Sequence, residues 1–192
     1  PRDVNTKDLL NSLREINEEI LDTLKFYNQN SLNKIEYLKK LNIKNSESGP
    51  VTNVDIKLND IIINKLMNDY PNQGWEILSE ENNKITNDNQ FQNDWVWIID
   101  PLDGTKDFIN NTGEYAVHIA LTYKSNVILS NVLIPYKEEA WYFLKGIGTW
   151  AESKIEKDIP LRQIKSKSLK DMVVVTSRNH CSKELSKILE YL

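Results

Sequence analysis

The sequence predicts an α+β fold in which helices pack on one face of a largely antiparallel sheet. Helical patterns come first, and a run of apolar strands separated by short turns follows them. A chain of 192 residues with 40% apolar and 27% charged side chains can bury a substantial core and is typical of a globular protein. We expect two units, residues 1–159 and the beginning of a second unit at residues 160–192.

The first helix is expected over residues 7–27. Apolar side chains recur there at helical spacing, from Leu9 to Leu24, and polar residues occupy the opposite face. Residues 35–43 fit either a short helix or an extended insertion. Residues 44–49 are polar and predict a loop.

A second long helix begins at Thr52 or Asn53, because both side chains can cap a helix. Asp55 falls in its first turn, where a negative charge meets the positive end of the helix dipole. Tyr70, which precedes a proline, ends this helix.

The rest of the chain has the pattern of strands. The turns between them are expected at residues 125–126 and 137–138. A polar, Asn-rich loop covers residues 82–93. In the second unit, one more strand and a helix are expected at residues 172–176 and 182–192. The predicted strands of the first unit are residues 75–78, 95–99, 115–123, 126–134, 139–144 and 148–152.

Composition and charge exclude several kinds of metal site and of binding partner. The single cysteine, Cys181, excludes an internal disulfide and a Cys-rich zinc site, and two histidines leave little for a His-based metal site. A metal would therefore be a hard cation held by carboxylates. A net charge of −4 makes a nucleic-acid polymer an unsuitable partner. No apolar run is long enough to cross a bilayer, and we expect a cytoplasmic protein, with loose attachment to a membrane left open.

Carboxylates follow two of the predicted strands. Glu80 comes shortly after residues 75–78, and Asp100 and Asp103 come after residues 95–99. A proline lies between the two aspartates, and a glycine follows the second one. If the two strands are neighbours, all three carboxylates converge, and their mutual repulsion would favour binding of Mg²⁺. The alternative is ordinary turn residues beside a solvated surface.

A longer motif makes the pattern specific. Residues 97–108 read Trp-Ile-Ile-Asp-Pro-Leu-Asp-Gly-Thr-Lys-Asp-Phe, which resembles the signature of the inositol monophosphatase superfamily of metal-dependent phosphatases. Three other segments occur in the order found in that family: residues 49–52 with Asp55, residues 78–81, and Gly113-Glu114. Lys after Asp-Gly-Thr, then Phe and Gly-Glu, resembles the branch of CysQ-type 3′(2′),5′-bisphosphate nucleotidases. The resemblance implies a layered sugar-phosphatase fold.

The resemblance also implies roles for individual residues. Thr105 and Asp55 correspond to the pair that orients and deprotonates the attacking water. The backbone N–H groups of Gly104 and Thr105 correspond to phosphate donors at the start of a helix. Lys44 and Lys106 are further candidate site residues. Four residues correspond to ligands of two or three Mg²⁺ ions: Glu80, Asp100, Leu102 through its carbonyl, and Asp103. The resemblance implies that all of them except Asp100 also contact the substrate.

The implied activity is Mg²⁺-dependent removal of the 3′-phosphate from adenosine 3′,5′-bisphosphate, giving AMP and phosphate. The alternatives are the same chemistry on inositol phosphates or other sugar phosphates, and a non-catalytic metal-binding or interaction module. The family also takes a metal-ligand aspartate from a C-terminal Trp-Asp motif, and none of the five tryptophans precedes Asp. We therefore expect an N-terminal fragment that is weakly active or inactive alone. The oligomeric state has no sequence signal.

Overall fold

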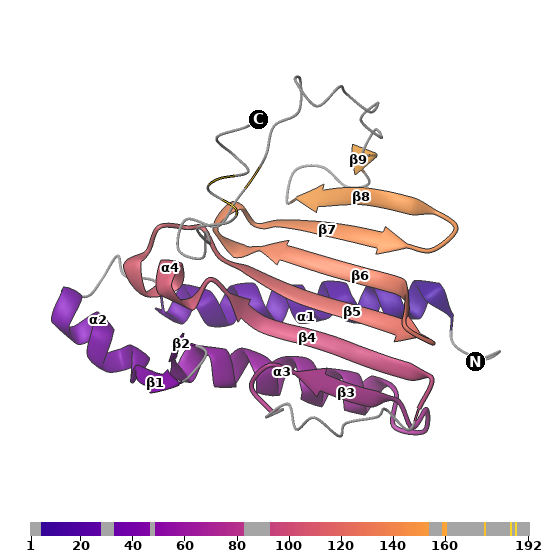
Figure 1. Cartoon of the computed structure of the whole chain (residues 1–192), viewed down its shortest axis with the longest axis horizontal. Helices are drawn as coiled ribbons and strands as arrows, with labels where there is room; N and C mark the ends of the chain where they lie inside the picture. The colour runs from indigo at the N-terminus through magenta and orange to yellow at the C-terminus, as the bar shows by residue number, and fades with distance from the viewer. Residues whose placement is uncertain are drawn as a thin grey trace. The chain divides into compact units, whose positions relative to one another are not determined.

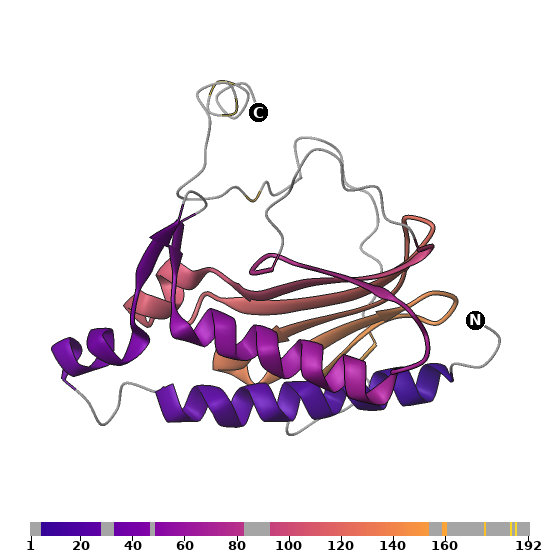
Figure 2. The same cartoon turned by 90° about the horizontal axis from the view of Figure 1, so that it is seen from below.

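A seven-stranded sheet with two long helices on one of its faces forms the first part of the chain. The computed structural model describes residues 5–27, 33–46, 49–82, 93–153 and 159–160, together with residues 175, 185 and 187. Helices α1 (Thr6–Tyr27) and α3 (Asn53–Asp69) run along the same face of the sheet (Figures 1 and 2). The α+β prediction with helices packed on one face is confirmed.

The chain divides into two compact units, Pro1–Leu161 and Arg162–Leu192. In the second unit, Leu185 and Lys187 are helical, within the helix expected over residues 182–192. Val175 is exposed and has no regular secondary structure. The other residues of the expected strand 172–176, and the loop residues 83–92, lie outside the described residues.

The helices begin and end where the sequence predicts them. The buried side of α1 includes Leu13, Ile16 and Ile20, at helical spacing. The short helix α2 (Lys34–Leu41) decides between the two alternatives for residues 35–43, and Asn33 caps it by accepting the Glu36 N–H.

The polar segment 44–49 is partly a hairpin, so the prediction of a loop is wrong there. Strands β1 (Lys44–Ser46) and β2 (Gly49–Val51) pair antiparallel, with Lys44 opposite Val51. Backbone hydrogen bonds alone can pair two short strands, so no apolar alternation is needed to form such a ribbon. The hairpin leads directly into Thr52, the residue that caps α3.

The large sheet follows the predicted strands closely. Its first pair, β3 (Glu76–Ser79) and β4 (Trp95–Asp103), is parallel, and each later pair is antiparallel. The strands lie in chain order, which places the longest central strands between the edges (Figure 1). After β4 come β5 (Ala116–Tyr123), β6 (Asn126–Ile134), β7 (Glu139–Leu144), β8 (Gly148–Ser153) and β9 (Ile159–Pro160).

Strand β4 continues four residues beyond its predicted end at Ile99. The register with β5 shifts between Asp100 and Asp103, and pairing resumes with Asp103 opposite Ala116. A bulge of this kind accommodates Pro101, which has no N–H to donate to the ladder, and changes the direction of the neighbouring side chains. The bulge therefore lies within the segment that carries the candidate site residues Asp100 to Asp103.

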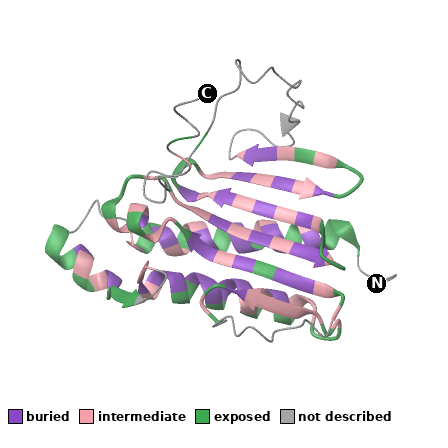
Figure 3. Cartoon of the chain, in the orientation of Figure 1, coloured by how far each residue is buried: buried purple, intermediate pink, exposed green. Residues whose placement is uncertain are grey.

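The core lies between the sheet and the two helices. Alternate residues of each central strand face the helices and are buried (Figure 3), among them Trp97 on β4 and Ile119 on β5. A polar group is buried in the same layer. Asn17 of α1 donates to the Asn131 side chain at 3.1 Å and to the Tyr142 hydroxyl at 3.0 Å, which ties α1 to β6 and β7.

Candidate active site

The site begins with a buried carboxylate at the start of α3. Asp55 is 2% exposed, and its Oδ2 accepts the backbone N–H of Thr52 at 2.7 Å and the Thr52 hydroxyl at 2.6 Å. Thr52 in turn accepts the Val54 N–H and completes the cap of the helix. The capping pattern read from the sequence thus fixes one oxygen of Asp55 and leaves the other, Oδ1, for a partner elsewhere in the chain.

That partner is Thr105, fifty residues further on. The Thr105 hydroxyl lies 2.8 Å from Asp55 Oδ1 and 3.1 Å from the Leu102 carbonyl oxygen. Its one proton can be donated to only one of them at a time, and a hydroxyl that donates to a carboxylate keeps its lone pairs free to accept another proton. The structure therefore brings together the two residues that the sequence analysis paired, in an arrangement suited to general-base chemistry.

Gly104 gives the chain the sharp turn between β4 and the short helix α4 (Thr105–Asn110). Its φ is +88°, a value that glycine tolerates and other residues rarely adopt. A Cβ atom at this position would lie 2.8 Å from the carbonyl oxygen of Glu114. The turn that carries Thr105 thus requires glycine both for its backbone angle and for the close approach of residue 114.

Glu80 and Asp100 lie next to each other. Because β3 and β4 are parallel and Ser79 pairs with Ile99, Glu80 follows the end of β3 next to Asp100 of β4, and the Glu80 N–H donates to the Ile99 carbonyl at 3.1 Å. Burial, the charges of Glu80 and Asp103 and a hydrogen bond with Glu80 raise the pKa of Asp100 to about 7, against the lowering effect of the Leu102 N–H.

Asp103 extends from the bulge toward the neighbouring strand. Its carboxylate is 63% exposed, and Oδ2 lies 3.6 Å from Nε2 of His118 on β5. Within the described ranges, no three His, Cys, Asp or Glu side chains are gathered closely enough to hold a metal ion. The three carboxylates and the Leu102 carbonyl are nevertheless hard oxygen donors, and the crowding of negative charge around Asp100 is the kind of environment that a divalent cation relieves. By donor chemistry, these residues fit Mg²⁺.

Two further residues belong to this neighbourhood and were not among the predicted site residues. Glu81 lies near Asp55, since burial first and then the charges of Asp55 and Glu80 raise the pKa of Glu81. His118 pairs with Asp100 in the sheet, and its Nε2 faces the Asp103 carboxylate. The Glu80-Glu81 doublet was the available signal for the first, and only the strand register reveals the second.

The two candidate lysines are both exposed. Lys106 lies on α4 directly after Thr105, and Lys44 lies on β1, paired with Val51 beside the α3 cap. No helix in the described part of the chain is long and apolar enough to span a membrane.

Comparison with known proteins defines the class. The inositol monophosphatase family matches residues 10–191. The chain is similar to the 3′(2′),5′-bisphosphate nucleotidase CysQ of Salmonella typhimurium, with 32% identity over 160 residues, which are 82% of this chain and 59% of that protein. The chain belongs to the inositol monophosphatase family. It spans about 59% of the length of that curated relative.

Solved structures agree on the fold. The crystal structure of inositol monophosphatase II from Staphylococcus aureus MSSA476 superposes with a TM-score of 0.71 at 20% identity and covers 95% of this chain and 61% of its own. An inositol monophosphatase/NADP phosphatase complexed with NADP and Ca²⁺ gives a TM-score of 0.62 at 21% identity, covering 78% of this chain and 52% of its own. At these identities the likeness shows the fold alone, which is the layered α+β fold expected from the sequence.

Proposed function

We propose that the complete protein is a Mg²⁺-dependent phosphomonoesterase that removes the 3′-phosphate of adenosine 3′,5′-bisphosphate, giving AMP and phosphate. The observation that carries this proposal is the Thr105–Asp55 hydrogen bond of 2.8 Å beside the crowded carboxylates. The similarity to CysQ supports the choice of a nucleoside bisphosphate. Residues 1–159 are then the metal-binding phosphatase domain, and a cytoplasmic location remains part of the proposal.

Each residue has a task in this reaction. Thr105 accepts a proton from the attacking water through its hydroxyl oxygen and passes its own proton to Asp55. The water oxygen forms a bond to phosphorus, the bond from phosphorus to the 3′ oxygen breaks, and the leaving oxygen takes up a proton from solvent. Asp55 then releases the proton that it received to solvent. The residues that would hold Mg²⁺ are Glu80, Asp100, Leu102 through its carbonyl, and Asp103. When bound, Mg²⁺ neutralises phosphoryl oxygens and makes water more acidic.

Substrate contacts complete the proposal. The backbone of Gly104 and Thr105 forms the turn into α4 and would face the phosphate together with Glu80 and Asp103. Lys106 is exposed beside this turn and can approach a phosphate oxygen from solvent. The partner is therefore a small phosphate ester.

The experiment compares phosphate release from adenosine 3′,5′-bisphosphate and from inositol 1-phosphate by the complete protein with Mg²⁺. Thr105→Val removes the hydroxyl at nearly constant volume, and we expect it to lower kcat by about 10²- to 10⁴-fold. The matched variant Thr105→Ser keeps the hydroxyl and should retain most of the activity.

Two outcomes would contradict the proposal in different ways. Faster release from inositol 1-phosphate would show that the substrate assignment is wrong while the chemistry holds. Release from neither ester would favour a non-catalytic metal-binding module.

A further inference from the structure

The Gly113-Glu114 pair singled out in the sequence has a packing partner. Gly113 has a φ of +82°, and a Cβ atom there would lie 2.7 Å from Cγ of Tyr136 and 2.9 Å from each of its Cδ atoms. Three ring carbons at nearly equal distances mean that the face of the Tyr136 ring covers Gly113. Any side chain at position 113 would displace the ring.

The other side of this segment packs against the candidate site. The Glu114 carbonyl oxygen would lie 2.8 Å, and the Tyr115 Cα atom 3.3 Å, from a Cβ placed on Gly104. Gly104 lies between Asp103 and Thr105 in the chain. The backbone of residues 113–115 is therefore held between the Tyr136 ring and the turn that carries the site residues.

Hydrogen bonds fix the same segment to α4. The Thr112 hydroxyl donates to Asp107 Oδ1 at 3.0 Å, and the Glu114 N–H donates to the Thr112 hydroxyl oxygen at 3.3 Å. Phe108 of α4 packs edge-on against Tyr115, with ring centroids 5.1 Å apart. Displacement of residues 113–115 would therefore also affect the helix that Thr105 begins.

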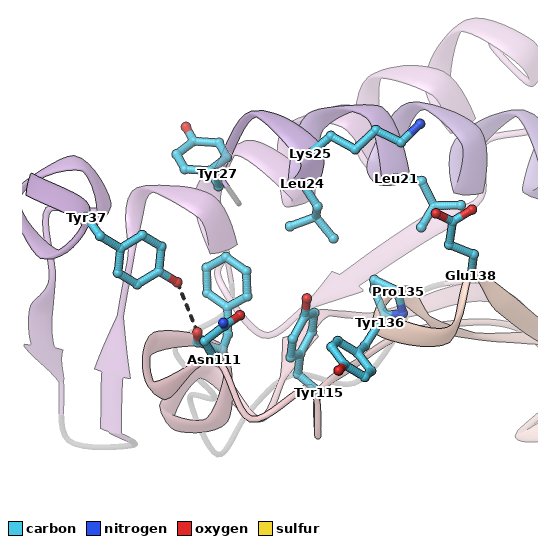
Figure 4. A pocket seen from close by; sticks show the side chains of 11 residues that line it. Leu21, Leu24, Lys25, Tyr27, Tyr37, Asn111, Tyr115, Pro135, Tyr136 and Glu138 are labelled. Carbon is cyan, nitrogen blue, oxygen red and sulfur yellow. Dashed lines mark hydrogen bonds between the residues drawn. The ribbon is translucent and has the colours of Figure 1, made fainter. Parts of the chain in front are cut away.

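Tyr136 lies in an unusual setting for a packing residue. It belongs to the short helix η2 (Pro135–Lys137) after β6, and it is 69% exposed. Together with Tyr115 it lines a cavity of about 350 Å³ beside the end of α1 (Figure 4). Replacing a side chain this exposed should change global stability little, so an effect of Tyr136 on the neighbouring segment can be measured separately from unfolding.

We propose that Tyr136 is a positioning residue of the site: its ring holds the backbone of residues 113–115 against Gly104 and so fixes the turn from which Asp103 and Thr105 extend. The contact between the Tyr136 ring and Gly113 is inferred from packing alone, whereas its effect on metal binding rests on the proposed function.

The test uses two variants of Tyr136 and a matched control. Tyr136→Ala removes the ring, whereas Tyr136→Phe removes only the hydroxyl and keeps the face that covers Gly113. Phe26→Ala removes an aromatic ring of equal exposure, 69%, from α1. Hydrogen exchange measures the mobility of residues 104–115, and calorimetry measures Mg²⁺ affinity in the complete protein.

We expect Tyr136→Ala to speed exchange across residues 104–115 and to weaken Mg²⁺ binding about tenfold, within the range known for residues that orient metal ligands. Tyr136→Phe and Phe26→Ala should match the unaltered protein in both measurements. The midpoint of urea unfolding should be nearly the same in all four proteins, which separates positioning from a general loss of stability.

A second route tests the contact without relying on one variant. Gly113→Ala should disturb the same segment, and because it acts through the same contact, its effect should be smaller in the Tyr136→Ala background. Additive effects would contradict the proposal.

The proposal is also overturned by unchanged exchange in Tyr136→Ala, or by faster exchange with unchanged Mg²⁺ affinity. Mg²⁺ uptake without hydrolysis would remove the proposed function and leave the positioning role intact.

Discussion

Asp100→Asn should remove a pH-dependent loss of stability from the metal-free protein. Burial and the charges of Glu80 and Asp103 raise the pKa of Asp100 from 3.8 to about 7. The folded state then holds a proton that the unfolded state has already released. Stability due to this group therefore falls as pH rises from 3.8 to about 7 and is constant above that value.

The size of the effect follows from the shift. Each pKa unit corresponds to about 1.4 kcal/mol, so the free energy of unfolding should fall by up to about 3 kcal/mol between pH 5 and pH 8. Asparagine cannot ionise and resembles the protonated carboxyl group in shape. Asp100→Asn should therefore lack this decrease, and its advantage over the unaltered protein should be larger at pH 8 than at pH 5.

Urea unfolding followed by tryptophan fluorescence measures this, because Trp95 and Trp97 lie in β4 beside Asp100. The series is run from pH 5 to pH 8 with a chelator and again with Mg²⁺. Added Mg²⁺ should restore stability at pH 8 in the unaltered protein and much less in Asp100→Asn. Asp94→Asn, at a carboxylate 55% exposed, is the matched control and should follow the unaltered protein. Parallel pH profiles for Asp100→Asn and the unaltered protein would refute the reasoning.

Two further predictions concern the fold that supports the site. Asn131→Leu removes a fully buried side chain that exchanges two hydrogen bonds with Asn17, and it should lower the free energy of unfolding in urea by about 1–3 kcal/mol. Replacing both asparagines with leucine should recover part of that loss, and a larger loss would contradict the account. Gly104→Ala forces a Cβ to within 2.8 Å of the Glu114 carbonyl at a φ of +88°, so it should lower the melting temperature by several degrees and weaken Mg²⁺ binding. Unchanged values for both would show that the turn tolerates a side chain.

Periodicity and capping predicted the two long helices and most of the strands of the large sheet. The apolar stripe of α1 and the Thr52 cap of α3 are local patterns, and local patterns survive in the folded chain. The pairing of residues 44–46 with residues 49–51 was missed because each strand has only three residues and neither shows an apolar alternation. The extension of β4 past Pro101 was missed because a bulge depends on the neighbouring strand, which a single segment does not reveal.

For the candidate site, too, local sequence patterns predicted some residues and missed those that depend on distant segments. The motif around Asp100 and Thr105 supplied the candidate residues, and the structure places the Thr105 hydroxyl against Asp55. His118 was not predicted as a site residue, because its proximity to Asp103 follows from strand register rather than from spacing in the chain. Glu81 was missed although it directly follows Glu80. Sequence patterns supplied the candidate residues, while long-range pairing determines which other charged side chains lie near them.

Calorimetric titration of Mg²⁺ into the complete protein and into Asp103→Asn tests whether these carboxylates form a metal site. We expect measurable Mg²⁺ uptake by the unaltered protein, and a large loss of affinity in Asp103→Asn with the fold and melting temperature retained. Undiminished Mg²⁺ binding by Asp103→Asn would remove this carboxylate from the site. Absence of binding by the unaltered protein would contradict the metal-dependent account as a whole.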